Sequence, residues 1–176
     1  MERSVLYTGP IGEFGVDAVT LPNGVSVSLA VLRHPGAAAV VPLHDDGSVT
    51  LLRQYRHAVG ATIWEIPAGK LDGREDPAAC AGRELAEEAG LEGDVVHLTT
   101  IHTTPAFTDE VIHLYVAQNL RPVPLAREAD EVIDTVRMPL DQAIAMVSSG
   151  EISDGKSVCA LLLVAARQTG TITTGR

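Results

Sequence analysis

The amino-acid sequence predicts an α/β protein, in which a mixed sheet carries helices on its faces. Segments with strand-like residue preferences, separated by turn residues, fill the first half of the chain. A helical pattern then appears over residues 76–89. Further strand segments and two closing helical segments follow it. This alternation of strands and helices is typical of the α/β class.

The length of 176 residues predicts one domain over residues 1–176, large enough for a sizeable core. We expect residues 1–35 to be an N-terminal strand region and residues 36–176 to be the core of the domain. Aromatic residues make up only 3 % of the chain, although 45 % is hydrophobic. The core must therefore consist mainly of Val, Leu, Ile and Ala.

The N-terminal region is predicted to contain strands at residues 4–7, 14–21 and 25–32. Gly9-Pro10 separates the first two, and Pro22-Asn23-Gly24 separates the second from the third. Because Asn-Gly favours a tight hairpin turn, the second and third strands are expected to pair.

Three more strands are predicted before the helix. Residues 37–43 and 49–55 are expected to pair across a turn at 45–47, which reads Asp-Asp-Gly. A short strand at residues 64–67 ends at Pro67.

The helix over residues 76–89 has signals at both ends. Asp76 can cap its first amide groups and Pro77 can occupy its first turn. Gly90 suits the left-handed residue that ends a helix. Gly82 within it costs roughly 1 kcal/mol relative to Ala. After this helix we expect strands at residues 95–103, 111–117 and 131–138 and helices at residues 140–148 and 157–167.

The net charge of −10 argues against non-specific nucleic-acid binding, which depends on Lys and Arg. The acidic residues either keep the protein soluble or bind cations that bridge to a polyanionic substrate. Cys80 and Cys159 are too few for a disulfide framework, and both are expected to be buried free thiols. The first residues lack a signal-peptide pattern, and no apolar run is long enough to span a membrane. A cytoplasmic protein is expected.

The segment 69–91, GKLDGREDPAACAGRELAEEAGL, carries the chemistry. Glu84 and Glu88 lie four residues apart and share one helical face, with Glu87 on its flank. Such neighbouring carboxylates repel one another, and a hard divalent cation such as Mg²⁺ relieves the repulsion. The cation would neutralise a diphosphate and acidify a bound water. A solvated Glu-rich helix face is the alternative, but it does not explain the flanking residues.

Two flanking residues fit the metal interpretation. Arg83 stands four residues before Glu87 and can hold it by an ion pair. Gly69 is expected to let the loop turn sharply, so that backbone carbonyl groups reach the metal.

This segment resembles the Nudix box, and every fixed position is present, from Gly69 and Glu75 to Gly90 and Leu91. The resemblance implies an α/β/α sandwich. It also implies that Glu84, Glu87 and Glu88 bind two or three Mg²⁺ ions, or Mn²⁺ in their place. Arg83 then belongs to the catalytic group, and Glu75 is a supporting carboxylate near the metal.

Flanking segments resemble the ADP-ribose pyrophosphatase group of that family. Residues 53–56 read RQYR, and Arg56 then contacts the diphosphate, with Arg53 as a second candidate. The resemblance also implies that Ala68 gives its backbone carbonyl to the metal. Pro105, fifteen residues after Gly90, is a marker of the group.

The loop over residues 104–110 closes over the diphosphate in that group and carries the catalytic base. Glu110 is the first candidate for this base, and Asp109 is the second. Phe107 and Tyr55 are candidates for stacking on the nucleobase. The N-terminal strands resemble the group's dimerisation region, which implies a homodimer. Ala30 departs from the pattern, since many relatives carry an acidic residue there.

The resemblance implies hydrolysis of ADP-ribose to AMP and ribose 5-phosphate. Another nucleoside diphosphate sugar, such as GDP-mannose, is the alternative substrate, and damaged nucleoside triphosphates are a more distant one. A non-catalytic nucleotide sensor is a different class, but such domains usually lose box carboxylates. His34, His57, His102 and His113 are interpreted as structural or surface residues and not as metal ligands.

Overall fold

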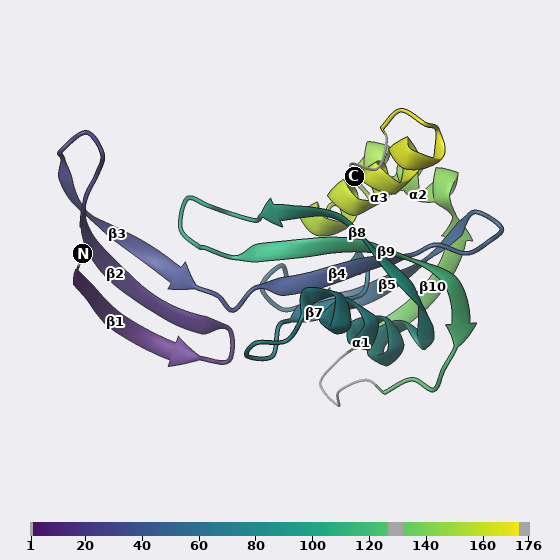
Figure 1. Ribbon diagram of the computed structural model, residues 1–176, viewed down its shortest axis with the longest axis horizontal. Helices are drawn as coiled ribbons and strands as arrows, with labels where there is room; N and C mark the ends of the chain where they lie inside the picture. Colours follow the sequence, from purple (N-terminus) through teal and green to yellow (C-terminus); the bar gives the residue numbers. More distant parts are fainter. Residues whose placement is uncertain (1, 127–131, 173–176) are drawn as a thin grey trace.

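The computed structural model describes residues 2–126 and 132–172. Its first part is a three-stranded antiparallel sheet of β1 (Glu2–Gly9), β2 (Gly12–Thr20) and β3 (Ser26–Arg33). β2 and β3 pair as far as Thr20 and Ser26, which confirms the hairpin predicted at the Asn-Gly turn. This N-terminal sheet projects from the rest of the molecule (Figure 1).

The second part contains the remaining elements. Its strands are β4 (Ala37–Pro42), β5 (Ser48–Arg56), β6 (Ala61–Glu65), β7 (Ala68–Lys70), β8 (Leu91–His102), β9 (Val111–Pro122) and β10 (Ile133–Pro139). Its helices are α1 (Pro77–Ala89), α2 (Leu140–Ser149) and α3 (Gly155–Gln168). One sheet has the order β7-β4-β9-β8 and the other has the order β10-β5-β6. Because β4 and β9 are parallel and their other neighbours are antiparallel, the architecture is mixed, as predicted.

The predicted pairing of residues 37–43 with residues 49–55 is wrong. β4 and β5 belong to different sheets, and an isolated bridge from Leu43 to Val49 links them. Every residue of β4 is buried, and β7 and β9 lie on its two sides. Burial on both faces favours a central position, and the chain supplies its neighbours from distant segments.

Other strand boundaries also differ from the prediction: β8 begins earlier, at Leu91, and β9 extends further, to Pro122. The strand expected over residues 64–67 ends earlier, at Glu65, and a separate strand β7 begins at Ala68. The final strand was expected from Glu131, which lies outside the described residues, and β10 begins at Ile133. These shifts are small, but they place Gly69 inside the strand β7 and not in a loop.

The helix that carries the box carboxylates begins and ends as predicted. The side chain of Asp76 accepts hydrogen bonds from the backbone N–H groups of Ala78 at 2.8 Å and Ala79 at 3.3 Å. Pro77 opens α1, and Gly90 ends it at φ 66° and ψ 35°, in the left-handed region.

Within the described ranges, the helices are too short or too polar to cross a bilayer.

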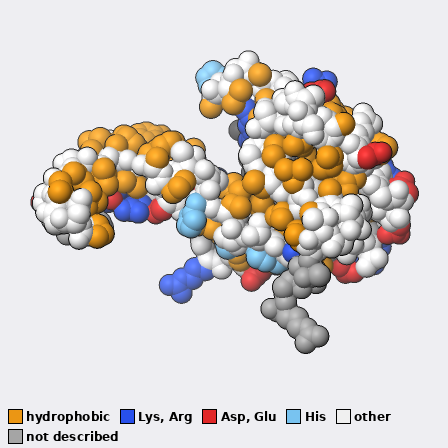
Figure 2. Space-filling view, turned by 90° about the horizontal axis from the view of Figure 1, so that it is seen from above, with side chains coloured by type: hydrophobic (Ala, Val, Ile, Leu, Met, Phe, Trp, Pro, Cys, Tyr) orange, Lys and Arg blue, Asp and Glu red, His pale blue; other side chains and the backbone are white. Residues whose placement is uncertain are grey.

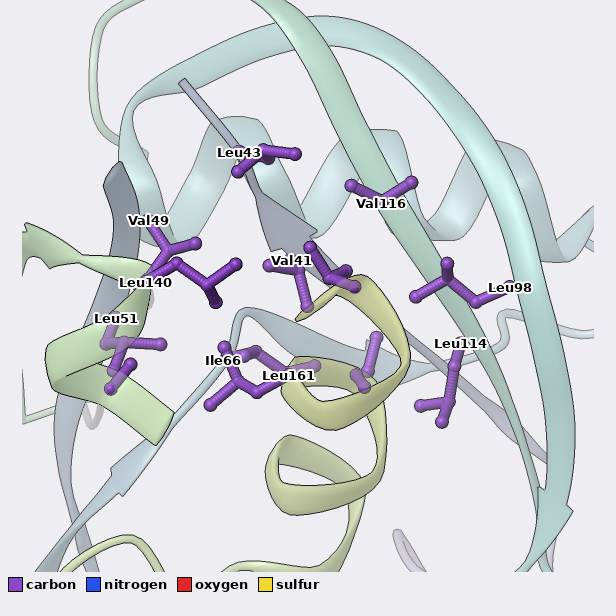
Figure 3. Close-up of a cluster of buried hydrophobic side chains, with 14 of the residues drawn as sticks. Val41, Leu43, Val49, Leu51, Ile66, Leu98, Leu114, Val116, Leu140 and Leu161 are labelled. Carbon is purple, nitrogen blue, oxygen red and sulfur yellow. The ribbon is translucent and has the colours of Figure 1, made fainter. Parts of the chain in front are cut away.

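The helices lie on opposite faces of the strands. Ala38 and Val40 of β4 pack in a cluster with Leu85 of α1. Alternate residues of the same strand, such as Val41, pack in the other cluster with Leu161 of α3. Figure 3 shows this second cluster, in which the labelled side chains of Val41 and Leu161 lie close together. With α1 on one side and α2 and α3 on the other (Figure 1), the fold is the expected α/β/α sandwich.

The two cysteines differ in their surroundings. Cys80 on α1 is buried, as predicted, and its thiol is free. Cys159 on α3 is also free, but it is exposed, so the prediction that it is buried is wrong. An apolar-looking helix still has one face toward solvent, and Cys159 lies on that face.

Candidate active site

A cavity of about 510 Å³ gathers most of the residues that the sequence singled out. Its lining includes residues of β5, β7, α1 and the loop before β9. The predicted residues among them are Arg56, Ala68, Gly69, Arg83, Glu84, Glu87, Glu88 and Glu110. Segments far apart in the sequence therefore converge on one cavity.

The carboxylates of α1 are unusually buried. Glu84 is 7 % exposed and Glu88 is 2 % exposed, and both line the cavity together with Glu87. The backbone N–H of Ala68 donates to Oε2 of Glu88 at 2.8 Å. Because a buried carboxylate is costly without compensation, the buried pair Glu84 and Glu88, next to the more exposed Glu87, favours a cationic partner.

Arg83 supplies part of this compensation. Its Nη1 donates to Oε1 of Glu84 at 2.7 Å and to Oε2 of Glu87 at 3.0 Å, which confirms the predicted pair with Glu87. Its Nε and Nη2 donate to the two oxygens of Glu75, each at 3.1 Å. This bidentate bond lowers the pKa of Glu75 to about 2, mainly through the Arg83 guanidinium and then through the N–H of Asp72. Glu75 thus holds Arg83.

Gly69 has a different role from the one predicted. It lies in β7 and is not among the described residues with positive φ, so the expected sharp turn is wrong. A Cβ atom at position 69 would lie 1.7 Å from Oε1 of Glu84. The Gly69 carbonyl accepts a hydrogen bond from the thiol of Cys80 at 3.6 Å. A side chain at position 69 would therefore displace the Glu84 carboxylate, which fills that space.

The donor set suits a hard divalent cation. The cavity offers carboxylate oxygens from three glutamates, which is the chemistry that Mg²⁺ and Mn²⁺ prefer. Within residues 2–126 and 132–172, no three His, Cys, Asp or Glu side chains already stand in ligating geometry. Arg83 contacts Glu84 and Glu87 instead. A cation would compete with Arg83 for these oxygens, while Glu75 would retain the guanidinium.

A cluster of charges that the sequence analysis missed forms another wall. Arg56 donates to both oxygens of Glu65, at 2.7 Å and 2.8 Å, and Lys156 of α3 also binds Glu65. Burial alone would raise the pKa of Glu65, but Arg56 and Lys156 outweigh it and the pKa lies below its ordinary value. The predicted phosphate ligand Arg56 is therefore already oriented. Gln54, two residues before Arg56, also lines the cavity, and this alternation along the strand was an available signal.

Three predicted substrate contacts lie outside the cavity lining. The guanidinium carbon of Arg53 lies 5.3 Å from the ring centre of Trp64, in a cation–π contact. Phe107 is 51 % exposed and Tyr55 is 46 % exposed. These three residues do not line the cavity that contains the carboxylates of α1.

The two candidates for the base have different surroundings. Glu110 lines the cavity and accepts a hydrogen bond from the Thr103 hydroxyl at 2.7 Å. Its other oxygen lies 3.6 Å from Nδ1 of His34. Asp109 instead accepts from the backbone N–H of His34 at 2.9 Å and from Arg33 at 3.1 Å. Burial would raise the pKa of Asp109, but these donors lower it below its usual range, which favours Glu110 as the base.

The N-terminal sheet is joined to this loop. Leu32 of β3 donates its N–H to the carbonyl of Phe107 at 2.8 Å and accepts from the N–H of Asp109 at 3.3 Å. Arg33 binds both Asp109 and the buried carboxylate of Asp17, at 3.1 Å and 2.6 Å. The loop that carries Glu110 therefore rests on β3.

Comparisons with known proteins agree with this geometry. The methanol dehydrogenase activator of Bacillus methanolicus is 39 % identical over 89 % of this chain and 86 % of its own length. An ADP-ribose pyrophosphatase of Mycobacterium tuberculosis is 37 % identical over 97 % of this chain and 84 % of its own. A crystal structure of an ADP compounds hydrolase has a TM-score of 0.83 over 97 % of this chain and 94 % of that chain. At 23 % identity, that structure supports the fold alone.

The model of the NUDIX domain family matches residues 32–161, which is most of the chain. This range includes the whole box, the loop with Glu110 and every residue that lines the cavity except Pro10 and Ile11. The chain therefore belongs to the Nudix family.

Proposed function

We propose that this protein hydrolyses ADP-ribose to AMP and ribose 5-phosphate with divalent cations, most simply two or three Mg²⁺ ions. The observation that carries the proposal is that Arg56 and Glu110 line the same cavity as the three box glutamates, Glu84, Glu87 and Glu88. The similarity to an ADP-ribose pyrophosphatase over nearly the whole chain supports this choice of substrate.

The three glutamates and the carbonyl of Ala68 would hold the cations. When bound, the cations supply charge neutralisation for the diphosphate and acidify a water molecule. Arg83 and Glu75 keep the glutamates in place, since the guanidinium spans Glu75 and the carboxylates of α1. These residues therefore orient ligands and do not themselves transfer protons.

Arg56 and Glu110 would act on the substrate and on water. Arg56 is fixed by Glu65 and presents its remaining N–H groups to the cavity, where they can bind a diphosphate oxygen. Glu110 would take the proton of the attacking water, because its carboxylate lines the same cavity on a loop. Arg53 and Phe107 would contact substrate only after a rearrangement of their side chains.

The test is hydrolysis of a panel that contains ADP-ribose, ADP-glucose, GDP-mannose, NADH and nucleoside triphosphates, with Mg²⁺ or Mn²⁺ and chromatography of the products. We expect AMP to appear fastest from ADP-ribose. Faster release of GMP from GDP-mannose would move the substrate assignment and keep the chemistry. Binding of ADP-ribose, seen as a rise in melting temperature, with no product would instead support a nucleotide sensor.

We also propose that the chain is a single-domain homodimer that joins through its N-terminal sheet. Hydrophobic side chains gather on the projecting sheet (Figure 2). Large hydrophobic residues are exposed on it: Val5, Leu6, Tyr7, Phe14 and Leu29. A monomer rarely exposes such a surface, whereas a second copy would cover it. Light scattering should give a dimer mass for the native protein and a monomer mass for Leu6→Asp, and a native monomer would refute the proposal.

A further inference from the structure

One polar atom in the wall of the cavity lacks a protein partner. Gln54 on β5 is 6 % exposed and lines the cavity. Its Oε1 is buried and has no hydrogen-bond partner in the part of the chain that the structure describes. Burying an acceptor without a donor costs free energy that folding does not recover. Since Gln54 lines the cavity, a ligand there can supply the donor once the amide group turns its oxygen toward the cavity.

Of the cationic side chains that line the same cavity as Gln54, Arg56 and Lys156 both bind Glu65. Arg56 uses its Nε and one Nη2 proton on Glu65, so three of its five N–H donors remain. Lys156 binds Glu65 and, at 3.0 Å, Asp154. Because Arg56 and Lys156 both bind Glu65, their charged groups are held near one another. The carboxylate of Glu65 offsets part of their positive charge. The arrangement is suited to phosphate oxygens.

The backbone fixes these side chains in advance. Gln54 and Arg56 alternate along β5 and therefore share one face of the strand. Lys156 stands in the first turn of α3, whose N-cap Asp154 accepts from Ser157. The Ser157 hydroxyl in turn accepts from the backbone N–H of Ile66 at 2.9 Å, next to Glu65. The first turn of α3 is thereby bound to the residue that follows Glu65 at the end of β6.

We propose that Gln54, Arg56 and Lys156 form a subsite for the sugar-phosphate half of the substrate, in which Gln54 accepts a hydrogen bond from a sugar hydroxyl. The inference rests on the proposed function and adds a specificity-determining residue to it. Two cations suit a phosphate, and the amide acceptor suits an adjacent hydroxyl. The three residues provide no aromatic ring on which a nucleobase could stack, so the sugar phosphate is the better fit.

The test compares two ligands that differ in their hydroxyl groups. Ribose 5-phosphate and methyl phosphate are titrated calorimetrically, in the presence of Mg²⁺, into the native protein and into Gln54→Met and Lys156→Met. Gln54→Met should lower the affinity for ribose 5-phosphate about tenfold, since one hydrogen bond to the sugar is lost. The affinity for methyl phosphate should not change. Lys156→Met should lower the affinity for both ligands about tenfold, because it removes a contact to the phosphate.

Matched variants separate these effects from general ones. Gln142→Met makes the same replacement on an exposed position of α2 and should change neither ligand. Lys70→Met removes the same charge from the cavity lining, but Lys70 donates to the carbonyl of Pro10 at 2.6 Å. It should therefore affect both ligands much less than Lys156→Met does.

Thermal unfolding of the free protein gives an independent measurement. If Gln54 had a structural role, Gln54→Met would lower the melting temperature. If its acceptor has no protein partner, Gln54→Met should leave the melting temperature unchanged or raise it. Equal weakening of both ligands by Gln54→Met, or a lower melting temperature without ligand selectivity, would overturn the proposal.

The proposal and the proposed function can fail separately. Normal hydrolysis of ADP-ribose without Gln54 selectivity would reject the subsite alone. Selective binding of ribose 5-phosphate by a protein that does not hydrolyse ADP-ribose would reject the assigned activity and keep the subsite.

Discussion

The replacement of Gly69 by Ala tests the arrangement of the carboxylates most directly. The new Cβ would lie 1.7 Å from Oε1 and 2.2 Å from Cδ of Glu84. An ordinary contact needs about 3.4 Å, so the carboxylate must move by roughly the length of a covalent bond. Because Mg²⁺ ligands tolerate errors of only about 0.2 Å, this displacement would remove Glu84 from a cation site.

We expect Gly69→Ala to fold but to lose about a hundredfold or more in kcat/KM for ADP-ribose. The end of a glutamate side chain can swing aside, so the cost to folding is small. The assay is hydrolysis over a range of Mg²⁺ concentrations, together with thermal unfolding. Excess Mg²⁺ should recover only part of the activity, since the Glu84 carboxylate is moved away from the cation site and does not merely bind the cation with lower affinity.

Gly82→Ala is the matched control in the same box. A Cβ there would have its nearest neighbour, Cγ2 of Val95, at 4.0 Å. Because Gly82 lies inside α1, the change should stabilise the protein by about 1 kcal/mol and keep activity. If Gly69→Ala were as active as Gly82→Ala, the packing of Glu84 against Gly69 would not matter for catalysis, and the reasoning would be refuted.

Further predictions concern the loop, the supporting carboxylate and the thiols. Glu110→Gln should lower kcat by about two orders of magnitude or more, whereas Asp109→Asn should mainly raise KM; equal losses of kcat would contradict the choice of Glu110. Since the folded pKa of Glu75 is about 2 and thus depressed, its contribution to stability is complete above about pH 5 and is lost as the pH falls toward 2. Glu75→Gln should therefore flatten the dependence of unfolding free energy on pH in that window, measured by urea titration. Because burial raises the pKa of Cys80 to about 12, iodoacetamide should label Cys159 in the native protein and Cys80 only after unfolding, as mass spectrometry would show.

Features that depend on a few neighbouring residues could be predicted from the sequence. The ends of α1 follow from Asp76 and Gly90, which act on backbone groups one turn away. The pair of Arg83 with Glu87 follows from helical spacing. The convergence of the box glutamates with Arg56 was anticipated by family resemblance and not by physical reasoning.

Features that depend on distant partners could not be predicted. β4 pairs with β9, which lies some seventy residues away, and not with β5 across the nearby turn. The space that Glu84 occupies beside Gly69 depends on how β7 meets α1. Lys156 reaches Glu65 only because α3 packs beneath the strands. Periodicity reports burial along one element, but it does not report which elements meet.

The attachment of the Glu110 loop to β3 has a consequence for enzymology. Leu32 shares backbone hydrogen bonds with Phe107 and Asp109, so the loop and the N-terminal sheet cannot move independently. If the sheet is ordered by a second copy, the loop is ordered with it. Turnover per active site would then depend on enzyme concentration, and dilution below the dissociation constant of the dimer would slow each molecule. Assays at nanomolar and micromolar enzyme would give different turnover numbers for the same preparation.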